Sequence, residues 1–359
     1  MTRIAAVAGA LPPNRYAQAE ITRTFADVVL TSPARRALLE RTHAATGVRA
    51  RHLALPLERY GELAGFREAN DAFVETGTDL AEVALTQALK QAGLAPEDVD
   101  LVMAVSVTGI AAPSIDARLV ARVGLRHDVK RVPVFGLGCV AGAAGIARVH
   151  DYLLGHPDDV AVLVSVELCS LTLQRDDDSM PNIVGSGLFG DGAAAVVLVG
   201  AERARSLRLG PGPRVKASRS RFYPDTERVM GWDIGGSGFR IVLAASVADV
   251  VDAHLGQDVR GFLADHGLTT GEVARWVAHP GGPKVLEAMA RTLALPRDAL
   301  GVTWAALADH GNLSSASVLH VLQRTLDGPV PQPGSAGVLL AMGPGFCAEL
   351  VLLEWVDGP

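Results

Sequence analysis

Cys139 has the setting of a reactive thiol. It follows a short apolar run (132–135) and two glycines, and it precedes a stretch of small residues that predicts a helix. A thiol at a helix start meets free backbone N–H groups and the positive end of the helix dipole, which favour the nucleophilic thiolate. An imidazole from the segment HPGG (279–282) and an amide from DHGNLSSAS (309–317) could complete a site that decarboxylates a thioester and forms a carbon–carbon bond.

The elements that must hold these side chains follow from the pattern of apolar residues. Short apolar runs typical of buried strands alternate with stretches of helical periodicity, which favours an α/β fold over a helical bundle or a β-sandwich. In the first half we predict a helix over 79–94 and strands over 99–107, 132–135, 160–168 and 192–200. In the second half we predict helices over 247–257 and from Leu313, and strands over 276–280, 302–307, 337–345 and 347–355.

The two halves share one spacing. Cys139 lies 40 residues after the strand that opens at Val99, and Asn312 lies 39 residues after the strand that opens at Val273. Both are therefore predicted at strand-to-helix junctions, which a duplicated unit with its equivalent helices back to back would bring together. We predict an N-terminal half over 1–210 with the nucleophilic Cys and a C-terminal half over 211–359 with the His and Asn. Residues 201–230 look like the crossover between them.

Composition excludes several other classes of protein. A net charge of −6 leaves no basic stripe for nucleic acid, and the longest uncharged apolar run, 132–147, is shorter than the ~20 residues of a membrane span. The N-terminus has no convincing signal peptide, and three cysteines without a C-x-x-C pattern fit a reducing cytoplasm. The acidic run 176–178 has no His or Cys at metal-ligand spacing and is expected to be a solvated loop. We predict no metal and no cofactor.

Five motifs together carry a family resemblance. GLGCVAG, LFGDGAAA, HPGGPKVL, GNLSSASVL and a GPG near the C-terminus, in this order, resemble the type III polyketide synthases, the chalcone synthase-like branch of the thiolase fold. The resemblance implies a homodimer of duplicated αβαβα units that joins an acyl-CoA starter to malonyl-CoA by decarboxylative condensation and cyclises the product. It implies that Cys139, His279 and Asn312 carry the chemistry, and that Phe189 and Phe239 match the family's two gatekeeping aromatics.

The chemistry of these side chains agrees with those roles. A thiolate both attacks a thioester and leaves again, and His279 beside Cys139 is expected to hold it as an ion pair near neutral pH. Decarboxylation of a malonyl thioester makes an enolate, whose oxygen needs N–H donors already aimed at it. His279 and Asn312 would supply them, although an Asn before LSSAS is also a favoured helix N-cap.

Further residues are candidates for binding substrate, each with a plainer alternative. Phe189 would form a wall beside the malonyl carboxylate, and it could equally be core packing, as could Phe239. Gly343-Pro344-Gly345 would shape cyclisation or simply form a turn. The remaining candidates are Cys169 and Thr172 at the end of strand 160–168, and Arg36, Arg41, Arg49 and Arg51, of which Arg41 is the chosen contact for the phosphates of CoA.

The expected substrate follows from the low content of aromatic residues. Only 5% of residues are aromatic, and small or aliphatic residues dominate SVTGIAAPS, NIVGSGLFG and GWDIGGSG. These leave room for a flexible chain, so the sequence favours a medium- to long-chain fatty acyl-CoA starter and an alkylpyrone or alkylresorcinol product. The chief alternative is a malonyl-primed enzyme making a small phenolic such as tetrahydroxynaphthalene, for which Cys169 is a hint.

Other interpretations of the sequence remain open. A ketoacyl-ACP synthase III-like enzyme would share the Cys, His and Asn, but HPGGPK and GPG point away from it. A degenerate thiolase-fold acyl-binding protein is the non-enzymatic alternative. A cysteine hydrolase is excluded because Leu137 and Ala141 occupy the glycine positions of G-x-C-x-G. The loop 106–116 matches the family segment that reaches the partner's cavity, with Ala112 where plant enzymes usually have methionine.

Overall fold

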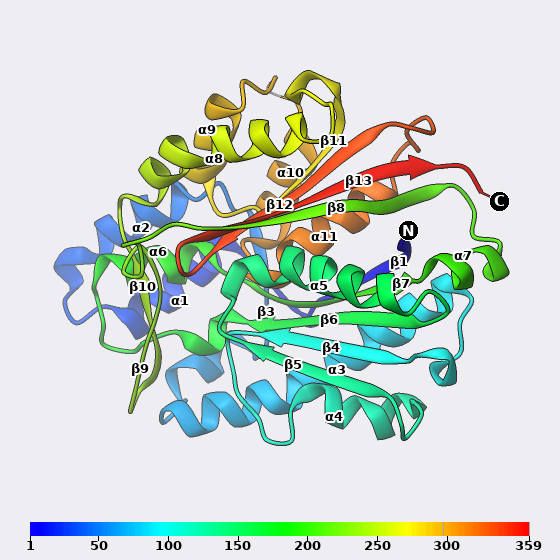
Figure 1. Cartoon of the computed structure of the whole chain (residues 1–359). Coiled ribbons are helices and arrows are strands. Elements are labelled where there is room, and N and C mark those ends of the chain that lie inside the picture. The colour runs from blue at the N-terminus through cyan, green and yellow to red at the C-terminus, as the bar shows by residue number, and fades with distance from the viewer. Residues whose placement is uncertain (297, 359) are drawn as a thin grey trace.

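Layers of helices and strands alternate through the molecule (Figure 1), in a computed structural model that describes residues 1–296 and 298–358. The strands are β1 (Arg3–Ala10), β2 (Asn14–Ala17), β3 (Ala50–Leu53), β4 (Leu101–Ser106), β5 (Lys130–Phe135), β6 (Val160–Leu168), β7 (Asp191–Val199), β8 (Gly212–Phe222), β9 (Met230–Gly235), β10 (Gly238–Leu243), β11 (Val273–Ala278), β12 (Ala336–Gly343) and β13 (Cys347–Val356). The α-helices are α1 (Gln18–Val29), α2 (Arg36–Ala44), α3 (Phe66–Ala92), α4 (Ile115–Leu119), α5 (Ala141–Gly155), α6 (Met180–Leu188), α7 (Ala201–Leu207), α8 (Val247–Ala264), α9 (Pro283–Thr292), α10 (Gly301–His310) and α11 (Ser315–Leu326).

Nine strands form one sheet made of two groups, while β2 with β3 and β9 with β10 form separate two-stranded sheets. The order in the nine-stranded sheet is β11-β12-β13-β8-β1-β7-β6-β4-β5, and β8 joins β1 through the single pair Arg3 and Arg214. In the first group β4 runs parallel to β5 and β6, and β7 is antiparallel to β6 and β1. In the second group β11 is parallel to β12, and β13 is antiparallel to β12 and β8. Each group therefore combines parallel and antiparallel pairs, as expected of a layered α/β fold.

Helices fill the space between the two groups and cover both outer faces. Helices α5 and α11 lie in the middle layer, α8 and α9 cover the outer face of one group, and α3 and α4 cover that of the other (Figure 1). Three buried clusters of Val, Leu, Ile and Ala separate these layers. The predicted αβαβα architecture is therefore confirmed.

The close approach of α5 and α11 is the part of the fold that builds the site. A Cβ at Gly142 would lie 2.3 Å from the carbonyl oxygen of Ser315, so only glycine allows this contact. Cys139 precedes α5 by two residues and Asn312 precedes α11 by three. Packing the two helix starts against each other brings their preceding turns together.

Two parts of the predicted secondary structure are wrong. Residues 302–307 form part of helix α10 rather than a strand, because Thr303, Ala306 and Leu307 are buried at helical spacing. Asn312 thus follows a helix. The expected crossover 201–230 does lead from β7 in the first group to the second group, and it contains α7 and the long strand β8. The hairpin of β9 and β10 was also missed, since its glycines weakened the strand pattern.

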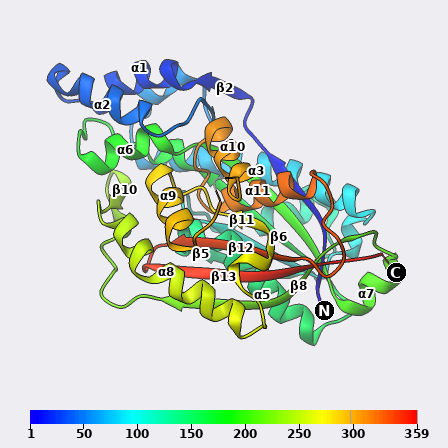
Figure 2. The same ribbon diagram turned by 90° about the horizontal axis from the view of Figure 1, so that it is seen from above.

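A view from above shows what surrounds one end of the molecule (Figure 2). Helices α1, α2 and α6 gather at the end opposite the two chain termini, with β10 beside them. Among the described residues, no helix is both long and apolar enough to cross a membrane.

Candidate active site

Cys139 lies where the sequence predicts it, at the entrance to α5. It is the middle residue of a short 3-10 turn, Gly138–Val140, between β5 and α5. Gly138 has φ +58°, and a Cβ there would lie 2.5 Å from Cδ of Pro344. The glycine therefore serves both the turn and the close approach of the GPG segment. The Cys139 side chain is buried, and its Sγ donates to Oγ of Ser314 at 3.6 Å.

Glu167 is a buried carboxylate behind this thiol that the sequence analysis missed. It is the second-last residue of strand β6 and accepts hydrogen bonds from Ser314 Oγ at 3.1 Å and Thr108 Oγ1 at 2.8 Å. The backbone N–H of Val107 and the hydroxyl of Ser315 also donate to it. Burial raises the pKa of Glu167. Its signal in the sequence was a single charged residue in the apolar run VAVLVSVEL.

Asn312 and Phe189 are held side by side by a short backbone bridge. The Asn312 N–H donates to the Leu188 carbonyl at 2.9 Å, and the Gly190 N–H donates to the Asn312 carbonyl at 2.9 Å. The Asn312 side-chain oxygen accepts from the backbone N–H of Ser314 at 2.8 Å. This bond orients the amide, so its Nδ2 remains the group that can donate to a ligand. Asn312 itself is not the N-cap of α11, a position that Ser314 occupies.

His279 follows β11 and is buried in the same region. Its backbone N–H donates to Leu340 on β12 at 2.9 Å, and Gly282 of the same loop packs near the Leu188 side chain. The Nδ1 atom of His279 is buried and has no hydrogen-bond partner among the described residues. Burial lowers the pKa of His279 to about 3.

The electrostatics of the buried site oppose the predicted ion pair. Burial, and then the charge of Glu167, raise the pKa of the Cys139 thiol to about 12, while the Ser314 hydrogen bond acts in the opposite direction. Burial also lowers the pKa of His279. Desolvation therefore works against the effect of the helix start, and both shifts favour the uncharged thiol and the uncharged imidazole.

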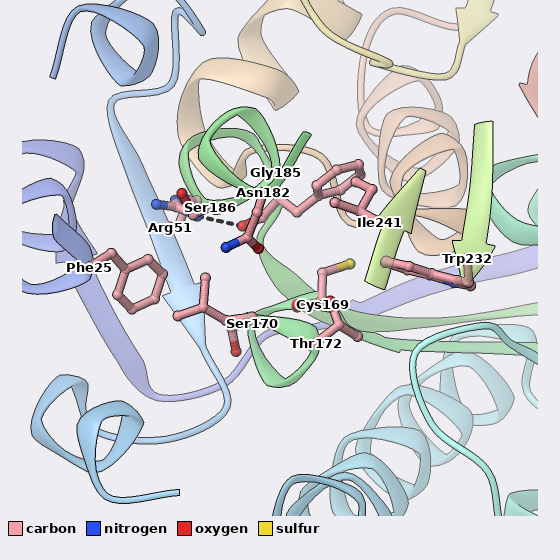
Figure 3. Close-up of a pocket in the computed structure, with 12 residues that line it drawn as sticks. Phe25, Arg51, Cys169, Ser170, Thr172, Asn182, Gly185, Ser186, Trp232 and Ile241 are labelled. Atoms are coloured by element: carbon pink, nitrogen blue, oxygen red, sulfur yellow. Dashed lines mark hydrogen bonds between the residues drawn. The ribbon is translucent and has the colours of Figure 1, made fainter. Parts of the chain in front are cut away.

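A narrow cavity extends beside Cys169 (Figure 3). The centre of a water molecule could move within only about 20 Å³ of this cavity. Figure 3 shows Trp232 and Ile241, from the hairpin of β9 and β10, on one side and Phe25 and Arg51 on the other. The lining residues are Phe25, Arg51, Cys169, Ser170, Thr172, Leu173, Asn182, Gly185, Ser186, Phe189, Trp232 and Ile241.

The other candidates fall in two places. Cys169, Thr172 and Phe189 line the cavity. Phe239 does not line it but is buried behind Trp232, with ring centroids 6.0 Å apart. Phe239 and Trp232 lie on the same face of the hairpin, since Phe239 pairs with Ile234, two residues from Trp232, and Trp232 is the ring that reaches the cavity.

The remaining candidates lie in two other places. Gly343 packs against the Cys139 turn, where a Cβ would lie 2.8 Å from the Val140 nitrogen, and Pro344 and Gly345 continue this contact toward Phe222. Arg41 is exposed on α2, at the same end of the molecule as the cavity helices α1 and α6. Among the described residues, no three His, Cys, Asp or Glu side chains form a group that could hold a metal ion.

Comparisons with known proteins agree with this arrangement. Residues 1–203 match the family model of the chalcone and stilbene synthase N-terminal domain, and residues 214–357 match that of the C-terminal domain. A 1,3,6,8-tetrahydroxynaphthalene synthase from Streptomyces peucetius subsp. caesius is 59% identical over 354 residues, which cover 99% of this chain and 93% of that relative. A putative chalcone synthase from Bacillus subtilis (strain 168) is 35% identical over 317 residues, 87% of each chain.

A solved structure shows the same fold. The crystal structure of 1,3,6,8-tetrahydroxynaphthalene synthase from Streptomyces coelicolor A3(2), a bacterial type III polyketide synthase, superposes with a TM-score of 0.92. It is 29% identical and covers 99% of this chain and 100% of that one. A layered fold with a buried cysteine at a helix start defines a thiolase-like condensing enzyme. The chain belongs to the chalcone and stilbene synthase family and is a type III polyketide synthase, an acyltransferase that works by decarboxylative condensation.

Proposed function

We propose that this enzyme is primed by malonyl-CoA and makes a small polyhydroxylated aromatic of the tetrahydroxynaphthalene type. The observation that carries the proposal is the 59% identity to a tetrahydroxynaphthalene synthase, over 99% of this chain. The cavity beside Cys169 supports it, because the three aromatic side chains in its wall, Phe25, Phe189 and Trp232, can pack against planar, unsaturated intermediates.

The expected fatty acyl starter is correspondingly less well supported. The low aromatic content predicted a roomy cavity, but three rings line it from separate segments: Phe25 on α1, Phe189 at the end of α6 and Trp232 on β9. Composition averages over the whole chain, whereas a cavity is lined by only a few residues.

Within this proposal, each side chain has a defined task. The Cys139 sulfur attacks the carbonyl carbon of the starter thioester and the bond to the CoA sulfur breaks, while His279 relays the thiol proton to the departing CoA sulfur and is neutral again afterwards. A malonyl extender then loses CO₂, and the electron pair of the broken bond forms an enolate whose oxygen accepts from Asn312 Nδ2 and His279. The enolate carbon attacks the acyl group on Cys139, whose sulfur leaves. Phe189, held beside Asn312, forms the wall of the decarboxylation site.

The test is product formation from defined CoA thioesters. With malonyl-CoA alone, we expect a naphthalene-type product by mass spectrometry, and Cys139→Ala, the matched control, should give none. A parallel series of C2 to C16 acyl-CoA starters should show falling kcat/KM with chain length. A rate that climbs into the C8 to C16 range, with little product from malonyl-CoA alone, would instead support the fatty acyl starter.

A homodimer belongs to the same proposal. Strand β5 is the last strand of its group, and Val132 and Phe135 expose 36% and 47% of their surface along it. Nearby Ile110 is 47% exposed in the loop 106–116. An apolar edge strand of this kind is a template for pairing with a second copy. Light scattering at micromolar concentration should give twice the mass of the chain, and a monomer mass would contradict it.

Two further points complete the proposal. The three cysteines are free, which suits a reducing cytoplasm. The division into halves over 1–210 and 211–359 is supported by the single residue pair between β1 and β8.

A further inference from the structure

Arg51 is a buried cation on β3 that the reaction above does not use. It is 1% exposed, although arginine is rarely buried without a partner. Its Nη1 donates to the Phe189 carbonyl at 2.6 Å, and its Nε donates to the side-chain oxygen of Gln18 at 3.0 Å. Its Nη2 is buried and has no hydrogen-bond partner among the described residues. The guanidinium therefore connects two neutral groups, and neither of them is a carboxylate that would offset its burial.

Gln18, the first residue of α1, contacts the same segment. Its Nε2 donates to the Gly187 carbonyl at 2.7 Å, while its oxygen accepts from Arg51. These two contacts fix which end of the amide faces which partner. Gly187 and Phe189 lie at the end of α6, where carbonyls have no partner within the helix and where a cation is favoured. The Arg51–Gln18 pair therefore holds two carbonyls of one short segment, 187–190.

The segment 187–190 is also the one that contacts Asn312. The Asn312 N–H donates to the Leu188 carbonyl at 2.9 Å, and the Gly190 N–H donates to the Asn312 carbonyl at 2.9 Å. The carbonyls on either side of Leu188 face the Arg51–Gln18 pair, while the Leu188 carbonyl faces Asn312. A shift on one side of the segment must move the other side, because planar peptide groups connect these atoms.

Arg51 also packs directly against the turn before Asn312. A Cβ at Gly311 would lie 3.1 Å from Cδ of Arg51, so the side chain fills the space beside this turn. The ring centre of Phe25 lies 5.7 Å from the guanidinium carbon, and Figure 3 shows both side chains on the same side of the cavity. Packing as well as hydrogen bonds therefore fixes the position of the guanidinium.

We propose that Arg51, oriented by Gln18, is a positioning residue for decarboxylation: it holds the segment 187–190, and through it the amide of Asn312, where the enolate oxygen forms. The inference rests on the role proposed above for Asn312 and adds the residues that fix its position. An N–H donor stabilises a developing charge only if it is aimed in advance, and a displacement of about 1 Å can lower a rate about a hundredfold. The attack of Cys139 on a thioester does not use the Asn312 amide, so acylation should not depend on Arg51.

The experiment measures two steps with malonyl-CoA on each variant. The first is ¹⁴CO₂ release, analysed for kcat and KM. The second is the rate at which Cys139 is acylated, read by rapid-quench intact-protein mass spectrometry with decarboxylated adducts counted. Arg51→Met removes both hydrogen bonds and keeps an unbranched side chain. We expect its kcat for CO₂ release to fall about ten- to a hundredfold, with KM and the acylation rate within about threefold of wild type.

Three further variants separate positioning from folding. Arg51→Lys, which keeps a charged donor, should release CO₂ at least about threefold faster than Arg51→Met. Arg23→Met, at an exposed arginine on the same helix as Gln18, is the matched control and should behave as wild type. In an Asn312→Ala background, Arg51→Met should lower CO₂ release by no more than about twofold, because a residue that acts through Asn312 has no further effect once that amide is gone.

Other results overturn the inference. Equal losses of CO₂ release and acylation in Arg51→Met show that the residue only maintains the fold, and losses that multiply in the double variant show that it does not act through Asn312. If Arg51→Met does not fold by thermal melting, Gln18→Leu, which removes the bond to Gly187, decides by the same two measurements. Unchanged release in Arg51→Met overturns this inference alone when Asn312→Ala loses release. The proposed role of Asn312 fails separately, when Asn312→Ala itself releases CO₂ as fast as wild type.

Discussion

Replacing Glu167 by glutamine tests whether this buried carboxylate controls the reactivity of Cys139. The link runs from Cys139 Sγ to Ser314 Oγ at 3.6 Å and from there to Glu167 Oε1 at 3.1 Å. The sulfur and the carboxylate oxygen are therefore at most about 6.7 Å apart, where two unit charges interact by about 2.5 kcal/mol at an effective dielectric constant of ~20. A negative charge at this distance opposes the thiolate, so Glu167→Gln should lower the pKa of Cys139 by about 1 to 2 pH units.

The assay is the rate of iodoacetamide alkylation of Cys139 as a function of pH, followed by intact-protein mass spectrometry. Only the thiolate reacts, so a pKa lowered by that amount raises the rate at pH 7 by about ten- to a hundredfold. The amide keeps the shape of the side chain, and the surrounding hydroxyls can turn to accept from it. Glu349→Gln, at a buried carboxylate that does not act on Cys139, is the control. An unchanged or slower rate in Glu167→Gln would refute the electrostatic reasoning.

Three further predictions concern the site and its stability. Cys139→Ala should abolish the acyl adduct in intact-protein mass spectra while Cys169→Ala keeps it; an adduct that persists on the Cys139 variant contradicts the assignment. Asn312→Ala should lose at least tenfold in ¹⁴CO₂ release from malonyl-CoA yet still become acylated; unchanged release removes Asn312 from the mechanism. Burial lowers the pKa of His310 to about 3 and of His320 to about 4. Below about pH 6.5 the unfolded chain therefore binds more protons than the folded chain, and the free energy of unfolding decreases as the pH is lowered, by up to about 1.4 kcal/mol per pH unit for each histidine. Urea unfolding at pH 7.5 and 5.0 measures this loss, and His320→Gln should reduce it; an equal loss in that variant counts against the explanation.

The sequence located the site through local signals. The glycines before Cys139 predict a tight turn into a helix, and the structure has that turn at Gly138–Val140. The buried strands 160–168 and 192–200 were confirmed almost residue for residue, because both runs are short and rich in valine, which favours a buried strand over a buried helix. Residues 302–307 were assigned wrongly because a short apolar run fits a strand and a buried helix equally well.

What the sequence by itself determined is the family, the layered α/β class and the identity of the side chains that can do the chemistry. These depend on residue types and on spacing along the chain, which are local properties. Tertiary structure alone decided the charge state of Cys139, since that depends on burial and on Glu167, 28 positions away along the chain. It also decided the cavity, where Phe25, Trp232 and Arg51 meet from three distant segments. Which side chains share a cavity, and which charge is left without a partner, follow from long-range packing that no local pattern encodes.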